Sequence, residues 1–341
     1  MKKEKGNVIA LLPIGVFLIL YLGLGILFEY IMKIPMGFYN VPIIIAFLTA
    51  ILVACLQNRA VNFDRKLEIM AHGVGDKNII TMLLIFLAAG SFVGVVGRNS
   101  AESVAYFMLT LIPARFSVAV LFVVACFVSV AMGTSVGTIT LLVPIAAAVS
   151  SASDFDLAFC VASVMGGAMF GDNLSFISDT TIAACNGQGC EMKDKFKANF
   201  FIVLPAAIIT VLIFWLATRN MSFQLEENLN YSLWEVLPYM VVLLGALIGI
   251  NVFVVLISGI VISLIVGVSM GHIALSEMFQ VVGSGVTSMY DITVISIIVA
   301  CIVSLVKEHG GIQFILNLIK SNINGRRGAE FGIALLALFV D

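Results

Sequence analysis

Residues 171–181, with the sequence GDNLSFISDTT, gather polar side chains between two strongly apolar stretches. The segment holds two carboxylates, one amide and four hydroxyl groups, and Gly171 allows the backbone to leave a helix there. Oxygen atoms of these groups are suited to hard cations such as Na⁺. The candidate ion-binding residues of this segment are Asp172, Asn173, Ser175, Ser178, Asp179, Thr180 and Thr181.

A second polar group interrupts an apolar stretch at residues 131–138, AMGTSVGT. Its glycines have the G-x-x-x-G spacing, which by itself indicates close helix packing as readily as a binding site. The position of the group, in the middle of an apolar stretch, favours a role in binding. We expect four of its residues to complete the ion site: Gly133, Thr134, Ser135 and Thr138.

The cost of burying charge decides between two interpretations of these motifs. Asp, Ser and Thr are also good helix caps, so a purely structural role is the alternative. Two carboxylates within an apolar region are costly, however, and such residues usually have a function. Burial favours the neutral form of a carboxylate, so a proton can compete with Na⁺ for it. We therefore predict a Na⁺ site formed by Asp179, Asp172, Ser178 and Ser135.

The composition places these motifs in a membrane protein. The chain of 341 residues is 61% hydrophobic and only 11% charged, whereas soluble domains contain about 25% charged residues. Its net charge of −2 gives no indication of a nucleic-acid partner. The sequence contains neither G-x-x-x-x-G-K-[ST] nor H-E-x-x-H. We therefore expect a protein of the lipid bilayer that is not an enzyme and needs no cofactor.

The apolar stretches predict an all-α polytopic protein. Residues 116–150 and 156–185 contain the polar motifs in their middle, so we expect a re-entrant hairpin and a broken helix there. With the N-terminus inside, 14 of the 18 Lys and Arg residues lie inside and 4 outside, as the positive-inside rule requires. This count predicts a multi-pass protein of the cell (inner) membrane with a cytoplasmic N-terminus. Bilayer-spanning helices are expected near 8–30, 40–57, 78–96, 198–218, 234–249, 252–270 and 291–306.

Two segments of the chain, 73–96 and 283–306, have similar hydropathy and matching glycines at an offset of 210 residues. We interpret residues 1–220 and 234–341 as two repeats. The first repeat has an odd number of predicted crossings, so the second must be inverted. Inverted repeats with broken helices are typical of secondary transporters. Because the offset carries the first polar motif past Asp341, we expect the second repeat to be incomplete.

The pair of motifs GTSVGT, at 133–138, and GDNLSFISDTT, at 171–181, resembles the signature of the NhaC family of Na⁺/H⁺ antiporters. The resemblance implies two inverted repeats with re-entrant hairpins, a fold of the ion transporter superfamily. It also implies that an ion site is lined by Asp172, Ser175, Ser178, Asp179 and Thr180.

The predicted function is secondary active transport that exchanges Na⁺ for H⁺. The chain has Phe176 and Val136 where members of that family often have Pro and Trp, and its relatives include exchangers of malate for lactate. The alternative is therefore an antiporter of an organic anion of the malate or lactate type, coupled to Na⁺ or protons, or of an amino acid. The absence of an obvious intramembrane Lys or Arg favours the cation exchanger. The sequence does not determine the oligomeric state, and a homodimer is one of the alternatives.

Overall fold

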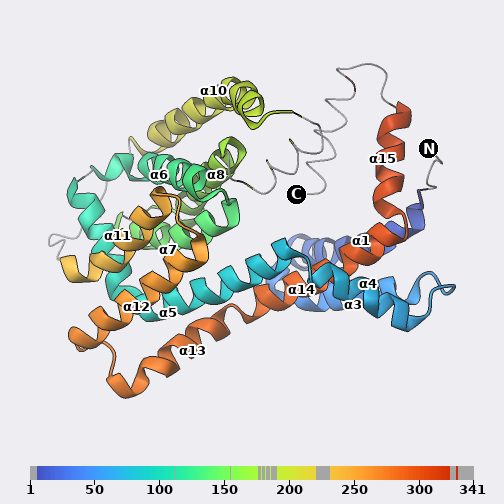
Figure 1. The fold of residues 1–341 in the computed structure, drawn as a ribbon, viewed down its shortest axis with the longest axis horizontal. Helices are drawn as coiled ribbons and strands as arrows, with labels where there is room; N and C mark the ends of the chain where they lie inside the picture. The colour runs from blue at the N-terminus through green and yellow to red at the C-terminus, as the bar shows by residue number, and fades with distance from the viewer. Residues whose placement is uncertain are drawn as a thin grey trace. The chain divides into compact units, whose positions relative to one another are not determined.

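The computed structural model describes residues 6–111, 113–153, 155–175, 178, 181, 185, 190–219, 231–322 and 328. Every regular element within these residues is a helix (Figure 1), because a helix satisfies its own backbone hydrogen bonds in a bilayer. The α-helices are α1 (Leu12–Leu18), α2 (Leu24–Ile26), α3 (Ile43–Leu56), α4 (Phe63–Val74), α5 (Lys77–Leu111), α6 (Ser117–Met132), α7 (Ser135–Ser153), α8 (Leu157–Leu174), α10 (Met192–Thr218), α11 (Leu233–Leu247), α12 (Val252–Ser269), α13 (Met278–Ser288), α14 (Tyr290–Glu308) and α15 (Gly311–Asn322).

Short 3-10 or π-helical turns connect or extend several of these helices. They are η1 (Val8–Leu11), η2 (Ile19–Gly23), η3 (Leu27–Ile31), η4 (Gly37–Asn40), η5 (Ala114–Phe116) and η6 (Leu275–Glu277).

Seven helices in the described part of the chain are long and apolar enough to cross a membrane. Helices α3, α6 and α11 are also apolar but shorter. The apolar spans expected from the sequence are therefore confirmed as helices, and the protein is a multi-pass membrane protein. The seven are Val8–Ile31, Lys77–Gly97, Ser135–Ser153, Leu157–Leu174, Lys193–Thr218, Val252–Ser269 and Tyr290–Glu308.

Interruptions of these helices occur where the sequence is rich in glycine or polar residues. Gly133, with φ 67°, turns the chain between α6 and α7, and Gly97, with φ 65°, kinks α5. Glycine is favoured at both positions because it has no Cβ to clash at positive φ. Helix α8 ends at Leu174, since Ser175 is extended with ψ 139°. The turn predicted in the middle of 116–150 is thus present between two helices.

The chain forms two compact units, residues 1–83 with 290–341 and residues 84–289. Each unit contains helices from both predicted repeats. In the first unit, α14 packs along α3 and α4 (Figure 1). Ala50 on α3 contacts the cluster of Ile298 and Ile302 on α14. Gly73 on α4 lies so close to the Ser304 side chain that a Cβ atom would not fit.

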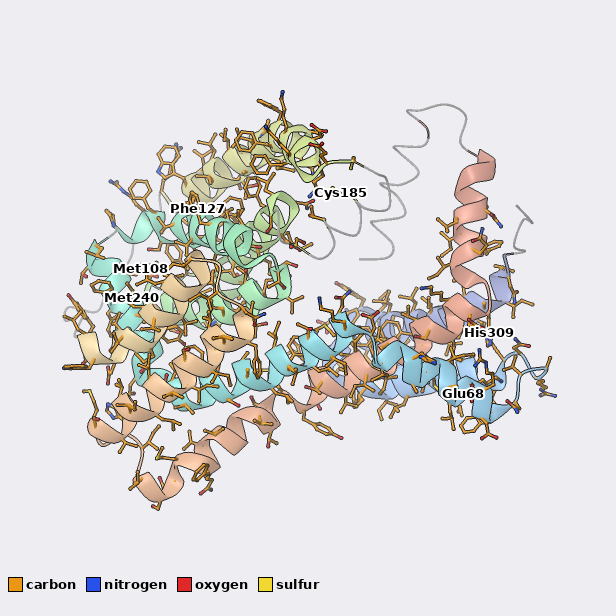
Figure 2. The ribbon with its side chains drawn as sticks, in the orientation of Figure 1. Glu68, Met108, Phe127, Cys185, Met240 and His309 are labelled. Carbon is orange, nitrogen blue, oxygen red and sulfur yellow. The ribbon has the colours of Figure 1, made fainter. Side chains whose placement is uncertain are left out.

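In the second unit, α6, α7 and α8 pack against one another, and α10 packs on α6 and α8. Helices α6 and α8 are parallel, because Gly167 faces Phe122 and Gly171 faces Cys126. Helix α10 is antiparallel to α8: its end near Phe214 contacts the start of α8, where the Phe159 and Phe214 rings are 5.0 Å apart. Exposed apolar side chains such as Phe127 cover the outside of α6 (Figure 2), as expected for a surface that faces lipid.

Candidate ion-binding site

The contact between α6 and α8 is built on a glycine of the second motif. A Cβ atom on Gly171 would collide with the carbonyl oxygen of Cys126 and would lie 2.6 Å from the Cβ of Ser129. The Ser129 hydroxyl, fully buried, donates to the carbonyl oxygen of Ala168 at 2.6 Å. Small residues that allow backbones to approach are typical of helix contacts in membranes. The contact brings the C-terminal ends of α6 and α8 together.

The end of α8 is held against α6 by a hydroxyl group of the second motif. Ser175, 1% exposed, donates from Oγ to the carbonyl oxygen of Val130 at 2.9 Å. Its own N–H donates to the carbonyl oxygen of Asp172 at 3.2 Å. The last turn of α8 and the polar residues that follow it therefore lie beside the last turn of α6.

The first motif forms the turn that follows α6 directly. Gly133 is left-handed, and the Thr134 hydroxyl accepts from the N–H of Gly137 at 3.3 Å, which caps the start of α7. The Thr138 hydroxyl donates to the carbonyl oxygen of Thr134 at 2.8 Å. Ser135 is the first residue of α7. The two polar motifs, 38 positions apart at their glycines, therefore meet at one end of the α6–α8 pair.

Residues 133–137 also spell G-x-S-x-G, a pattern known from hydrolases in which a serine sits between a strand and a helix. Here the serine lies between two helices, α6 and α7. The structural context of that catalytic motif is missing at this position.

A carboxylate in the last turn of α8 lies near an ammonium group from α10. Asp172 Oδ1 is buried and has no hydrogen-bond partner within the described part of the chain. Lys195, on the first turn of α10, donates from Nζ to the carbonyl oxygen of Asn173 and to Thr181 Oγ1, the latter at 2.8 Å. The Asp172 charge is near enough to act on Lys195. Thr181 is 4% exposed, whereas Asn173 is exposed and Lys195 is partly exposed.

The remaining predicted ligands have different positions. Ser178 is buried, whereas the Asn173 side chain is exposed and donates to the Met169 carbonyl oxygen of its own helix at 3.4 Å. Asp179 and Thr180 lie outside the described residues. The predicted joint ligation of Na⁺ by Asp179, Asp172, Ser178 and Ser135 therefore stays a prediction.

The sequence matches the family model described as "Na+/H+ antiporter family" over residues 7–218, which is more than half of the chain. The chain belongs to the Na⁺/H⁺ antiporter family. The matched region of the chain includes both polar motifs and the whole α6–α8 contact.

Two curated relatives of the chain are named as antiporters. It is 25% identical over 250 residues to the malate-2H(+)/Na(+)-lactate antiporter of Bacillus subtilis, covering 68% of this chain and 50% of that protein. It is 25% identical over 203 residues to the Na(+)/H(+) antiporter NhaC of Bacillus subtilis, covering 55% and 44%. The chain thus spans about half the length of these relatives or less. No solved structure matches it.

Lys195 is not among the residues that the two sequence motifs predict for the site. It lies in the charged segment EMKDKFKANF before an apolar run, which reads as an interfacial helix. The sequence does contain one signal for Lys195: its segment follows the second motif, 171–181, after only a short connection. A short connection between antiparallel helices brings their ends together. A cationic side chain is therefore present at the site, contrary to the expectation from the sequence.

A second polar cluster of the chain is also not predicted by the sequence motifs. Glu235 Oε1 is 2.8 Å from His272 Nε2, and Ser103 Oγ donates to Glu235 Oε2 at 2.5 Å. Asn99 Nδ2 lies 3.4 Å from the other nitrogen of the His272 ring. The cluster borders a cavity of about 260 Å³ at the Gly97 kink. Glu235 is 8% exposed, and both of its oxygens have partners.

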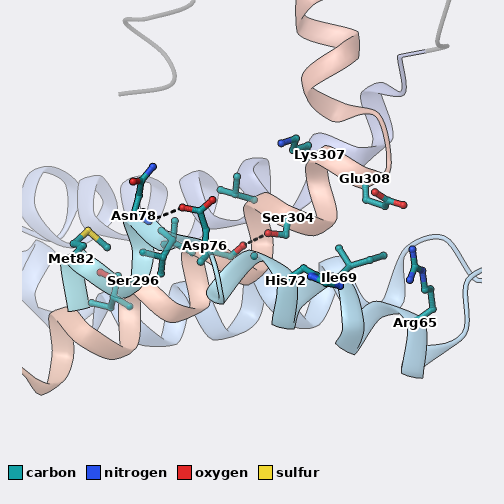
Figure 3. Close-up of a pocket in the computed structure, with 16 residues that line it drawn as sticks. Arg65, Ile69, His72, Asp76, Asn78, Met82, Ser296, Ser304, Lys307 and Glu308 are labelled. Atoms are coloured by element: carbon teal, nitrogen blue, oxygen red, sulfur yellow. Dashed lines mark hydrogen bonds between the residues drawn. The ribbon is translucent and has the colours of Figure 1, made fainter. Parts of the chain in front are cut away.

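The first unit of the chain contains a charged groove of about 860 Å³ between α4, the start of α5 and α14 (Figure 3). Asp76 Oδ1 accepts from the N–H of Asn78 at 2.8 Å at its edge. Arg65 and Lys307 lie at the other end of this groove, which contains none of the predicted site residues.

Proposed function

We propose that this protein exchanges Na⁺ for H⁺ across a membrane at the polar site where α6 and α8 end. The observation that carries the proposal is the buried Oδ1 of Asp172, which has no hydrogen-bond partner among the residues that the structure describes. A buried carboxylate oxygen without a partner is costly, and either a proton or a Na⁺ ion would supply one. One oxygen does not hold both at full strength, so occupation by one ion opposes occupation by the other. This competition is the basis of exchange.

The surroundings of Asp172 favour a cation. The carboxyl end of a helix carries partial negative charge on carbonyl groups that lack an intrahelical partner, and α8 ends at Leu174. Broken helices in transporters use such carbonyl oxygens for Na⁺ or H⁺. We assign the transported Na⁺ to Asp172 and Asp179, with the hydroxyl groups of Ser178 and Ser135 as further ligands.

We also propose that the chain contains an inverted repeat. In the first unit, Gly73 lies against Ala300 and Ser304, and in the second unit Gly285 lies against Gly90 and Gly94. Adding 210 to positions 90 and 94 gives 300 and 304, and subtracting 210 from 285 gives 75, two positions from 73. A two-fold relation exchanges partners in this reciprocal manner.

A second pair of contacts supports the same relation. Ala50 packs in a cluster with Ile302 in the first unit, and a Cβ atom on Gly259 would lie 2.8 Å from the Phe92 ring in the second. The offset of 210 carries position 50 to 260 and position 302 to 92. The reciprocal contacts therefore extend to α3 and α12, and they favour the repeats 1–220 and 234–341.

The hairpin of α6 and α7 supports a re-entrant element in this proposal. The two helices run in opposite directions, and their turn lies at the same level as the polar end of α8. A chain that enters and leaves on one side at 116–150 satisfies the positive-inside count with the N-terminus in the cytoplasm.

Transport by the purified, full-length protein in proteoliposomes tests this function. We expect an imposed Na⁺ gradient to move protons in the opposite direction, and an imposed pH gradient to drive ²²Na⁺ uptake. Vesicles without protein, and vesicles given a choline gradient, are the controls. Proton movement that is the same with Na⁺ and choline would contradict the proposal.

A second candidate function is exchange of an organic anion. It is favoured by Lys195, whose ammonium group at the site can pair with a carboxylate. The similarity to the malate-2H(+)/Na(+)-lactate antiporter of Bacillus subtilis also favours it. The same vesicles loaded with malate or lactate distinguish the two functions. Na⁺ exchange that requires one of these anions would favour the second.

A further inference from the structure

The ammonium group of Lys195 occupies a position with the ligands of a cation site. Its acceptors are the Asn173 carbonyl oxygen, at the end of α8, and the Thr181 hydroxyl, at 2.8 Å. Both are among the oxygen types that bind Na⁺ in broken helices. The nearby Asp172 supplies the negative charge. The ammonium group therefore has the surroundings that the transported ion requires.

We propose that Lys195 is a tethered competitor that fills the ion site when no Na⁺ is bound. The proposal rests on the proposed function, because it concerns the same site. An ammonium ion and Na⁺ that share these oxygens would repel each other at close range, where Coulomb energies are large. Na⁺ binding therefore displaces the ammonium group from Asn173 and Thr181 without any change in covalent bonds.

The charges around Lys195 support this role. The Cys185 thiol and the Asp172 carboxylate both act on the Lys195 charge. On α10 itself the described charged neighbours are Lys193 and Lys197, which repel it, and Asp194, which attracts it. Asp172 Oδ1 has no hydrogen-bond partner among the described residues, so removing the ammonium group takes away a cation whose charge acts on this carboxylate. A tethered cation thus stabilises the empty site, and an incoming Na⁺ ion must replace it.

The displacement also links ion binding to the packing of α8 and α10. Lys195 connects the start of α10 to the end of α8 and to Thr181. Once Na⁺ takes these oxygens, this connection is released. We infer that the ion-free protein holds α10 on α8 more firmly at this end than the Na⁺-bound protein does.

Na⁺ affinity of the purified, full-length protein tests the competition. We expect Lys195→Gln to bind ²²Na⁺ about tenfold more tightly than wild type, because the competing charge is gone. Lys195→Arg keeps the charge and is expected to bind Na⁺ as weakly as wild type. Lys66→Gln, which removes a buried lysine outside this site, is the matched control and should leave Na⁺ affinity unchanged. Equal or weaker Na⁺ binding in Lys195→Gln would overturn the proposal.

Chemical labelling of the wild-type protein gives a test that needs no variant. Acetylation of lysines followed by mass spectrometry measures how accessible each ammonium group is. We expect Na⁺, compared with choline, to increase the labelling of Lys195 several-fold, as its two acceptors are lost, and to leave Lys66 unchanged. Labelling of Lys195 that does not respond to a bound Na⁺ would refute the displacement. If the wild type binds no ²²Na⁺ at all, the proposed function itself fails, a result distinct from Na⁺ binding that ignores Lys195.

Discussion

Lys66 and Lys195 have equivalent places in their local structures but different surroundings. Each is the fourth residue of its helix, α4 or α10, and each reaches back to the C-terminal end of the preceding apolar helix. Lys66, 4% exposed, donates to the carbonyl oxygens of Cys55 and Gln57 at 2.7 and 2.6 Å. Lys195 has one carbonyl oxygen, one hydroxyl group and a nearby carboxylate.

The difference lies in what remains when the lysine is withdrawn. Without Lys66, two carbonyl groups at the end of α3 lose their partner. Both of these acceptors are neutral, so they attract a replacement cation only weakly. Without Lys195, the oxygens of Asn173 and Thr181 stand beside the charge of Asp172. The same helix-capping contact is therefore structural at the end of α3 and exchangeable, in our proposal, at the end of α8.

The largest effect is expected from Asp172→Asn, which removes the charge that distinguishes the two lysines. The side chain keeps its size but no longer attracts a cation. Interactions with a charged group are worth roughly 1.5–3 kcal/mol, so Na⁺ affinity should fall about 10- to 100-fold. ²²Na⁺ binding and Na⁺-driven proton movement measure this change. Labelling of Lys195 should then be as insensitive to Na⁺ as that of Lys66.

The result of Asp172→Asn also separates the two carboxylates of the second motif. Wild-type affinity in this variant would remove Asp172 from the site and leave Asp179 as the ligand. It would also make Lys195 a helix cap of the same kind as Lys66.

The next largest effect concerns the packing that positions Asp172. Gly171→Ala places a Cβ atom against the Cys126 carbonyl oxygen and Ser129. Overpacking of this kind costs about 1–3 kcal/mol, and we expect a lower melting temperature and weaker Na⁺ binding. Gly166→Ala, on the same helix, is the control, because its Cβ atom would lie 3.5 Å from the Phe122 ring, an ordinary contact. Equal stability of the two variants would contradict the close α6–α8 contact.

A smaller effect is expected from Lys66→Gln. A buried group that loses its partner costs about 1–3 kcal/mol, and the glutamine amide regains part of this by donating to one carbonyl. The variant should therefore melt at a lower temperature, whereas ²²Na⁺ affinity and Lys195 labelling should be those of wild type. A change in Na⁺ affinity would show that the end of α3 is coupled to ion binding, and would end the contrast between the two lysines.

Much of the fold follows from hydropathy, whereas the partners of the site do not. Apolar runs near 252–270 and 291–306 predict α12 and α14 to within a few residues, because their length and composition suffice. Gly133, the first of the two glycines in the motif 131–138, predicts the turn at its own position, since few other residues adopt its positive φ. These features depend on residues that are close in the sequence.

The role of Lys195 depends instead on contacts between distant residues. Its charged neighbours indicate a solvated segment, and only the antiparallel packing of α10 on α8 brings its ammonium group to Asn173 and Thr181. Glu235 and His272 are similar: they are 37 positions apart, and each looks ordinary in its own segment. A pattern along one helix does not contain this information.

The smallest effect is expected from Glu235→Gln, which compares a partnered carboxylate with the unpartnered one of Asp172. Both oxygens of Glu235 already accept a hydrogen bond or ion pair, from His272 at 2.8 Å and from Ser103 at 2.5 Å, so neither needs a bound ion as a partner. Glutamine keeps the shape and one acceptor, and we expect a loss of stability of about 1 kcal/mol and Na⁺ affinity within about twofold of wild type. Melting temperature and ²²Na⁺ binding of this variant, measured beside Asp172→Asn, test the contrast. A loss of Na⁺ exchange as large as that of Asp172→Asn would place Glu235 on the path of the ions. The presence of hydrogen-bond partners on both oxygens would then no longer distinguish a structural carboxylate from one that binds the transported ion.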